Sequence, residues 1–287
     1  MRQSESSDLT LRPLAGALGA EIQGIDLSAP RGSTAFAPIR EAFLRYGVIF
    51  FRDQSLSRPA QLALAAHFGK PELHPIANGM EDYPEIIRVL KPEGEEAFFG
   101  TSWHTDNSFF EAPSSTTILY GETVPPCGGD TVFASMELAY QTLSEPIKAL
   151  IDPLRAVHTA ADAYDPRTTG EAKYRGETAI SYTFSDAIYE RVEHPVVRTH
   201  PETGRKALYV NAMFTDHIVG LNRHESDALL AMLYAHATRQ ELTCRFRWEP
   251  GSIAIWDNRC VQHYAINDYA EFERVMYRVT IQGTPPV

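Results

Sequence analysis

The last part of the chain, residues 242–282, has the pattern of one strand after another, and this limits the possible folds most strongly. Residues 242–248 alternate between apolar and polar side chains, as the two faces of a strand do. Residues 252–256 and 274–282 follow as further strands. Short strands that cluster late in a chain with few helices favour a jelly roll, in which two sheets face each other. We therefore expect a mainly β protein with flanking helices, of the α+β class.

The earlier part of the chain supplies the expected helices and the other strands. Apolar residues at helical spacing predict helices over residues 35–45, 59–68, 136–143, 146–151 and 225–238. Shorter β-rich runs predict strands over 48–51, 86–90, 116–122 and 131–134, and a hairpin over 195–210. No shift in composition marks a second domain, so residues 1–287 are expected to form one. Residues 152–193 are the least regular part, and a loop this long predicts an active-site lid.

Charge and cysteine content narrow the possible partners and the location. The formal net charge of -11 argues against nucleic acid, because phosphate binding needs a basic face. No apolar run approaches the roughly 20 residues that span a bilayer, so no membrane partner is expected. The start, Met1 to Leu11, lacks the apolar segment of a signal peptide, and the cysteines form no Cys-x-x-Cys pair. We expect a cytoplasmic protein, assembled as a homodimer or homotetramer.

The stretch Trp103-His104-Thr105-Asp106 places an imidazole and a carboxylate two residues apart. If the backbone is extended there, both side chains leave the same face and point at one spot. Such donors suit a borderline or hard divalent metal, but two ligands are too few, and His263 is the candidate for the third. Two histidines and one carboxylate form the facial triad of non-haem Fe(II) oxygenases, which leaves three positions open. Alone, a His-x-Asp pair is more often a surface hydrogen bond.

The strand predicted over residues 274–281 carries two arginines on one face. Arg274, Met276 and Arg278 alternate with an apolar face that begins at Val275. Arginines four residues apart on a strand lie about 13 Å apart along its axis, so they can converge on one site or address two anionic groups. Arginine is well suited to bidentate binding of a carboxylate or sulfonate. The alternative is an exposed strand face with solvated arginines.

Three further features are candidate parts of a site. The turn Gly128-Gly129-Asp130-Thr131 could bring a hydroxyl and backbone amides to a bound anion, although an ordinary hairpin turn is the commoner interpretation. His74 could donate to an anionic substrate, or could be a surface or capping histidine. Cys260 could be a nucleophile, but nothing places a base or an oxyanion donor beside it.

Together and in this order, the motifs resemble the taurine and 2,4-D dioxygenase (TauD/TfdA) family of Fe(II)- and 2-oxoglutarate-dependent enzymes. The resemblance runs from about residue 11 to residue 283. It rests on the 103–106 stretch, the 128–131 turn, Trp256-Asp257-Asn258-Arg259 with His263, and Arg274 with Arg278. The spacings from His104 to Thr131, and from His263 to the two arginines, also match those of the family.

The resemblance implies a double-stranded β-helix, which is a cupin-like jelly roll, and the cofactors Fe(II), 2-oxoglutarate and O₂. His104, Asp106 and His263 would hold the iron and form the catalytic centre. The family couples the decarboxylation of 2-oxoglutarate, to succinate and CO₂, with hydroxylation of a substrate C–H bond. The protein would supply coordination, orientation and exclusion of water.

The resemblance also implies which residues bind the two organic acids. Arg274, assisted by Thr131, would bind the distal carboxylate of 2-oxoglutarate. Arg278 would lie near the cosubstrate and reach the acidic group of the substrate. His74 matches the family's substrate-facing histidine, and Phe214 matches an aromatic wall of the pocket.

Departures from the family pattern bear on the substrate. Taurine-specific members place a tyrosine at the position of Ala77, an asparagine at that of Gly100, and a phenylalanine at that of Ala160. Loss of bulk and of polar donors argues against a tight fit to taurine. We expect a larger small anionic organic substrate: a sulfonate, a sulfate ester or an aryloxyalkanoate.

Two other functions are compatible with the same ligands. Two histidines, a carboxylate and a water also suit catalytic zinc, so a zinc-dependent hydrolase is one alternative. It leaves Arg274, Arg278 and Thr131 without a shared task. The other alternative is a non-catalytic jelly-roll protein that binds a small acid.

Overall fold

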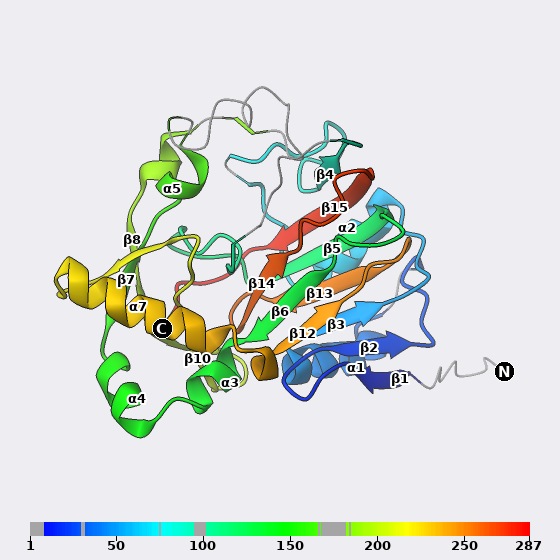
Figure 1. The fold of residues 1–287 in the computed structure, drawn as a ribbon. Helices are drawn as coiled ribbons and strands as arrows, with labels where there is room; N and C mark the ends of the chain where they lie inside the picture. The colour runs from blue at the N-terminus through cyan, green and yellow to red at the C-terminus, as the bar shows by residue number, and fades with distance from the viewer. Residues whose placement is uncertain are drawn as a thin grey trace.

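The structure, a computed structural model, is mostly β-sheet with helices around it (Figure 1). It describes residues 9–29, 32–74, 76–94, 102–165, 167, 182–183 and 185–287. The strands are β1 (Thr10–Pro13), β2 (Ala20–Gln23), β3 (Val48–Phe51), β4 (Ile87–Lys91), β5 (Thr116–Thr123), β6 (Thr131–Ser135), β7 (Arg155–His158), β8 (Val192–Pro195), β9 (Val197–Thr199), β10 (Lys206–Leu208), β11 (Thr215–Ile218), β12 (Thr243–Phe246), β13 (Ile253–Asp257), β14 (Val261–Ala265) and β15 (Arg274–Ile281). The helices are α1 (Ser33–Tyr46), α2 (Arg58–Ala66), α3 (Met136–Gln141), α4 (Glu145–Ile151), α5 (Ala161–Tyr164) and α7 (Arg223–Ala237), with 3₁₀ turns η2 (Asp186–Tyr189) and η3 (Gln240–Leu242).

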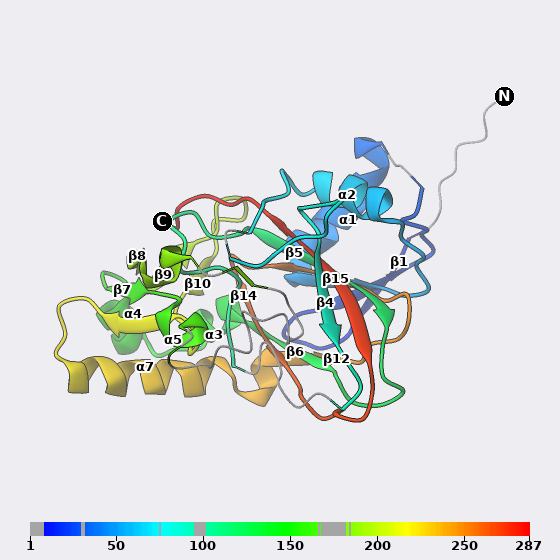
Figure 2. The same ribbon diagram turned by 90° about the horizontal axis from the view of Figure 1, so that it is seen from above.

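Two sheets form the body of the protein. The larger has seven strands in the order β1-β2-β3-β13-β5-β15-β4, and the smaller has three in the order β12-β6-β14. Figure 2 shows the layers from above: α1 and α2, then the large sheet, then the small sheet. The late strands β12 to β15 are divided between both sheets, so the strand-rich end of the chain organises the whole body, as the sequence predicts.

Alternation along the central strands produces a core on each side of the large sheet. On β15, Val275, Tyr277 and Val279 pack with α1 and α2, whereas Met276 packs with the core between the sheets. Phe50 of β3 lies in that inner core, and its ring centroid is 4.0 Å from that of Phe246 and 5.6 Å from that of Phe133. Full burial of one such side chain contributes roughly 1.5–3 kcal/mol, so the aromatic contacts hold the two sheets together.

The first two helices lie where the sequence predicts, with ends shifted by one or two residues. Gly47, with φ 70°, ends α1 by donating its N–H to the carbonyl of Phe43. Ser57 caps α2 by accepting from the N–H of Ala60, and Pro59 follows in the first turn. The other predicted helices and strands also appear, with ends shifted by one to a few residues.

The segment expected to be an irregular lid, residues 152–193, is more regular than predicted where it is described. It contains β7, α5, η2 and the start of β8, and β7 pairs with both β8 and β11. The buried residues of β7 follow no alternation, so the strand period was not visible in the sequence. Part of the expected lid, residues 166, 168–181 and 184, lies outside the described residues. Among the described helices, none is long and apolar enough to cross a membrane.

Candidate active site

A pair of backbone hydrogen bonds brings His104 and His263 together. The N–H of His104 donates to the carbonyl of His263 at 3.1 Å, and the reverse bond measures 2.8 Å. Residues directly opposite each other in an antiparallel pair place their side chains on the same face. The two imidazole centroids are accordingly 4.2 Å apart. β14, which carries His263, is held in turn by β6.

Asp106 joins this pair from the turn that follows His104. Its Oδ1 lies 3.7 Å from His104 Nε2 and 3.0 Å from Arg278 Nη2, and its Oδ2 accepts from the hydroxyl of Thr117 at 2.6 Å. Asn258 fixes the arrangement by accepting from the backbone N–H of Asp106 and donating to the Thr117 hydroxyl. The extended backbone expected from residue 104 to 106 stops short, because Asp106 already begins a turn.

The donor set fits a divalent metal ion. One ligand atom from each of His104, Asp106 and His263 lies within 4.8 Å of the others. His104 Nδ1 is 2.7 Å from the carbonyl of Ser102, which leaves Nε2 facing Asp106. Metal-binding histidines commonly use the second ring nitrogen in this way. His263 Nδ1 is buried and has no hydrogen-bond partner among the described residues.

The electrostatics favour the ligating forms of all three groups. Burial, reinforced by the neighbouring His104, lowers the pKa of His263 to about 3, and burial also lowers the pKa of His104. Burial alone would raise the pKa of Asp106, but the Arg278 guanidinium and the two imidazoles hold it below its usual range. Neutral imidazoles beside an ionised carboxylate are the forms that bind a metal.

Arg274 lies in a second part of the site, between two aromatic rings. Its guanidinium carbon is 5.6 Å from the ring of Trp248 and 5.6 Å from that of Tyr269. The Trp248 N–H donates to the hydroxyl of Thr131 at 3.0 Å. Arg274 is only 6% exposed, and its Nε and Nη2 have no hydrogen-bond partner among the described residues. The alternative of a solvated arginine face is therefore wrong, because Arg278 is buried as well.

One cavity connects the two parts of the site. It has a volume of about 70 Å³ and is lined by the three candidate metal ligands, Thr131 and both arginines. Val89, Leu119 and Met276 supply its apolar walls. An acid held by Arg274 would thus share a cavity with a metal held by the other three side chains.

The Gly128-Gly129 turn binds the chain's own carboxylate. Gly129 donates its N–H to Asp268 Oδ1 at 2.7 Å, and a Cβ at Gly128 would lie 2.6 Å from the same oxygen. Both glycines have positive φ, which a larger residue rarely adopts. Of the turn's expected contributions to an anion site, only Thr131 lines the cavity.

His74 makes hydrogen bonds to other residues of the protein through both ring nitrogens. Its Nδ1 accepts from the backbone N–H groups of Ile76 and Ala77 at 3.2 and 2.9 Å. Because Nδ1 accepts, Nε2 carries the hydrogen, and it lies 3.0 Å from Asn107 Oδ1. Burial, followed by the charge of Arg278, lowers the pKa of His74 to about 4. The donor expected to face a substrate is thus already bound by Asn107.

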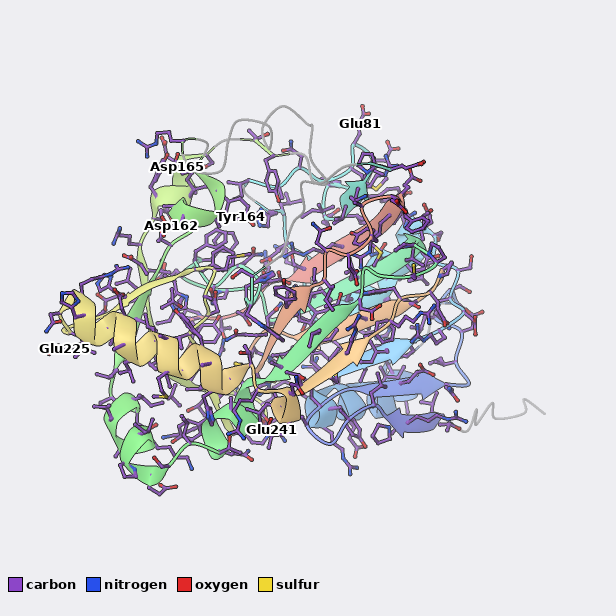
Figure 3. All side chains as sticks on the ribbon, viewed as in Figure 1. Glu81, Asp162, Tyr164, Asp165, Glu225 and Glu241 are labelled. Carbon is purple, nitrogen blue, oxygen red and sulfur yellow. The ribbon has the colours of Figure 1, made fainter. Side chains whose placement is uncertain are left out.

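The residues aligned with the substrate pocket lie in a separate apolar cluster. Ala77, Ala160 and Phe214 are all buried in it, and the Phe214 ring meets His104 edge-on at 6.1 Å. Tyr164 projects from α5 toward the body of the protein in Figure 3, and its ring stacks on Phe214 at 6.3 Å. Gly100 lies outside the described residues.

Several side chains that orient the site were missed in the sequence. They are Asn107, Thr117, Trp248, Asn258 and Tyr269. Two carried a usable signal: Thr117 lies on the inward face of an alternating strand, and Asn258 lies inside the Trp256-Asp257-Asn258-Arg259 motif. The others act through contacts between distant parts of the chain.

Comparison with known proteins gives consistent matches over nearly the full length. The family model described as "Taurine catabolism dioxygenase TauD, TfdA family" matches residues 10–280. An alpha-ketoglutarate-dependent sulfate ester dioxygenase of Pseudomonas putida is 39% identical, over 98% of this chain and 91% of that protein. An alkylsulfatase of Acinetobacter baylyi is 38% identical, over 98% of this chain and 87% of that protein. The crystal structure of a taurine dioxygenase from Burkholderia xenovorans superposes with a TM-score of 0.82 at 39% identity, covering 97% of this chain and 92% of that one.

Proposed function

The chain belongs to the TauD, TfdA family of 2-oxoglutarate-dependent dioxygenases, and from that premise we propose which residues carry the reaction and which acid it acts on. The family membership confirms the expected reaction class and the use of Fe(II), 2-oxoglutarate and O₂. The zinc hydrolase and the non-catalytic binder are not favoured.

Iron is assigned to His104, Asp106 and His263. Three features support this: the 4.8 Å grouping of their ligand atoms, the Ser102 carbonyl on the outer nitrogen of His104, and the ionised state of Asp106. A triad of this composition leaves three coordination positions for the cosubstrate and O₂. The bound iron and 2-oxoglutarate would supply the oxidising chemistry, and the protein would orient the reactants and exclude water.

Arg274 is assigned to the distal carboxylate of 2-oxoglutarate, and its unpartnered nitrogens are the observation that carries the proposal. A buried guanidinium without an acid is strongly unfavourable, so Arg274, which lines the cavity and has two nitrogens without a described partner, needs an anionic partner. Thr131, whose hydroxyl accepts from Trp248, can donate its own hydrogen to the same carboxylate. Arg278 forms an ion pair with Asp106 and lines the same cavity, so it is assigned to the region between cosubstrate and substrate.

The proposed substrate is an organic acid larger than taurine, with alkyl sulfate esters first among sulfonates, sulfate esters and aryloxyalkanoates. The small side chains of Ala77 and Ala160 and the ring of Phe214 give the substrate side an apolar character. A sulfate ester dioxygenase and an alkylsulfatase among the relatives point in the same direction. An alkyl chain can lie along such a surface while its anionic end reaches Arg278.

The sheet arrangement supports a jelly-roll core. The seven-stranded and three-stranded sheets enclose one apolar core and hold the candidate ligands between them. We propose a double-stranded β-helix as the topology, and one domain over residues 1–287 with a lid between 152 and 193.

The assignment of the iron and cosubstrate is tested by anaerobic addition of Fe(II) and 2-oxoglutarate. A visible metal-to-ligand charge-transfer band is expected with the unmodified protein and not with Arg274→Met. Retention of zinc alone, with no band, would instead support a hydrolase. Retention of no metal would support a binding protein.

The substrate class is tested by identifying what is released along with succinate. Hydroxylation of the carbon that bears a sulfate oxygen gives a hemiacetal ester, which collapses to an aldehyde and sulfate. The same step on a sulfonate gives an aldehyde and sulfite, and on an aryloxyalkanoate it gives a phenol. Sulfate release from medium-chain alkyl sulfates is the expected result. Taurine as clearly the best substrate would overturn the proposal.

A further inference from the structure

A buried lysine at the end of β4 lies outside every role assigned so far. Lys91 is 2% exposed, and its Nζ donates to backbone carbonyls of Pro92 at 3.0 Å, Ala270 at 2.6 Å and Phe272 at 3.0 Å, with that of Tyr269 at 3.3 Å. An ammonium group has three hydrogens, so these oxygens use all of them. Lys91 forms no ion pair with a described carboxylate. Within the described part of the chain, its charge is balanced by carbonyl dipoles.

Three of the four carbonyls belong to residues 269–272, which lead into β15, and Tyr269 of this segment contacts Arg274, which lines the cavity. Lys91 pairs with Arg274 across β4 and β15, and Figure 2 shows these two strands side by side. Tyr269 lies between them: its hydroxyl is 3.4 Å from Arg274 Nη1, and its ring is 5.1 Å from Lys91 Nζ. Gly94, just after β4, adds a backbone bond to Ala270 at 2.9 Å.

We propose that Lys91 is a positioning residue for 2-oxoglutarate: its ammonium group fixes residues 269–272 and so holds Tyr269 against Arg274 before the cosubstrate arrives. The inference rests on the proposed role of Arg274. The guanidinium lies 5.6 Å from each of the Trp248 and Tyr269 rings, Arg274 lines the cavity, and its Nε and Nη2 have no hydrogen-bond partner among the described residues. Without Lys91 the segment would have to be ordered during binding, and affinity would fall in proportion to the ordered fraction.

The experiment measures 2-oxoglutarate and metal binding separately in Lys91→Met. We expect 2-oxoglutarate to bind about tenfold more weakly, as for a pocket formed in about a tenth of the molecules, with Mn(II) affinity unchanged. Lys206→Met is the matched control, because it removes the same charge from an exposed lysine paired with Asp152. Unchanged 2-oxoglutarate binding in folded Lys91→Met, or an equal loss of Mn(II) binding, overturns the proposal. If Arg274→Met also leaves 2-oxoglutarate binding unchanged, the cosubstrate assignment itself has failed.

Chemical rescue distinguishes positioning from general loss of stability. Lys91→Ala leaves a space that n-propylammonium matches, and millimolar n-propylammonium should restore 2-oxoglutarate binding. Tetramethylammonium, which has no N–H to donate, should not. Equal effects of the two ions would contradict the proposal.

A measurement on the unmodified protein covers the case in which neither variant folds. Amide hydrogen exchange over residues 266–273 should be slow before 2-oxoglutarate is added and should change little afterwards. Fast exchange that becomes slow only with 2-oxoglutarate would show that Lys91 does not preset the segment.

Discussion

Two buried carboxylates, Asp106 and Asp257, have the same kinds of neighbours and use their oxygens differently. Each belongs to a group of His, Asp or Cys residues with ligand atoms within 4.8 Å, the second being His200, Asp257 and Cys260. Each also contacts an arginine. Residue type alone therefore does not separate a reactive centre from a structural one.

The difference lies in how completely the oxygens are bound. Asp257 accepts from Arg259 Nε and Nη2, both at 2.7 Å, and lies 3.0 Å from His200 Nε2. A metal would have to displace a doubly bonded guanidinium, and burial raises the pKa of the Cys260 thiol well above its usual range. At Asp106, by contrast, the arginine forms an ion pair through Nη2 to one oxygen, without the paired hydrogen bonds found at Asp257.

Asn258 connects the two carboxylates. It follows Asp257 in the chain, accepts from the N–H of Trp256, and bonds to both Thr117 and the backbone of Asp106. The contacts to Asp106 and Thr117 are thus made by the side chain of Asn258 and not by Asp257 or Arg259. The two groups thus differ in that His263 Nδ1 and Arg278 Nε lack hydrogen-bond partners among the described residues, and the proposed function of the first group rests on that difference.

The largest expected effect is loss of metal binding in Asp106→Asn. Removing the charged ligand should weaken Mn(II) or Fe(II) binding by well over about 100-fold, since even outer-sphere partners contribute about 10- to 100-fold. Equilibrium dialysis against Mn(II) measures it. Asp257→Asn is the control and should bind as the unmodified protein does; equal losses would erase the distinction between the two groups.

Asp257→Asn should instead lower the free energy of unfolding. It leaves the Arg259 guanidinium buried without its carboxylate, which costs about 3–5 kcal/mol. Urea unfolding of metal-free protein measures the change. A loss below about 1 kcal/mol would mean that Glu202, which also bonds to Arg259, suffices to balance the charge.

A smaller effect is expected for Thr117→Val, which removes the hydroxyl bond to Asp106 Oδ2. The carboxylate keeps its charge but loses one constraint, so Mn(II) affinity should fall about tenfold. Thr116→Val, a neighbouring change on the same strand, serves as the control. Metal affinity unaltered by Thr117→Val would indicate that Arg278 alone orients Asp106.

The smallest effect is a pH dependence of the destabilisation in Asp257→Asn. Burial alone would raise the pKa of Asp257, but Arg259 and His200 hold it below the unfolded value of about 3.9. The carboxylate's stabilisation is complete above that value and is lost as pH falls through the lower folded pKa. The difference in the free energy of unfolding between the unmodified protein and Asp257→Asn should therefore be constant from pH 5 to pH 7. It should shrink only in stronger acid. A difference in the free energy of unfolding that changes between pH 5 and pH 7 would mean that a titratable group other than Asp257 is responsible.

The sequence predicted groups that carry distinctive side chains at regular spacing. The alternation of β15 was enough to place Arg274 and Arg278 on one face, and the His104, Asp106 and His263 triad came from residue type and family spacing. The sequence could not predict hydrogen bonds in which the partner of a side chain is a backbone atom. Lys91 looks like an ordinary solvated lysine, because the carbonyls of residues 269–272 leave no trace in side-chain pattern. The sequence left open whether the amides of the Gly128-Gly129 turn meet a bound anion or belong to an ordinary hairpin turn; the Gly129 amide donates to the side chain of Asp268.

The mutual backbone bond between His104 and His263 also has a consequence for biosynthesis. The two proposed ligands are separated by more than half of the polypeptide, so a nascent chain of which only the first half has been made would lack part of the proposed metal site. With this ligand set, iron binding would have to wait until β14 has been synthesised and has paired. A truncated chain that ends before β14 would not bind iron at this site, so bound iron would indicate that the chain has been synthesised through His263.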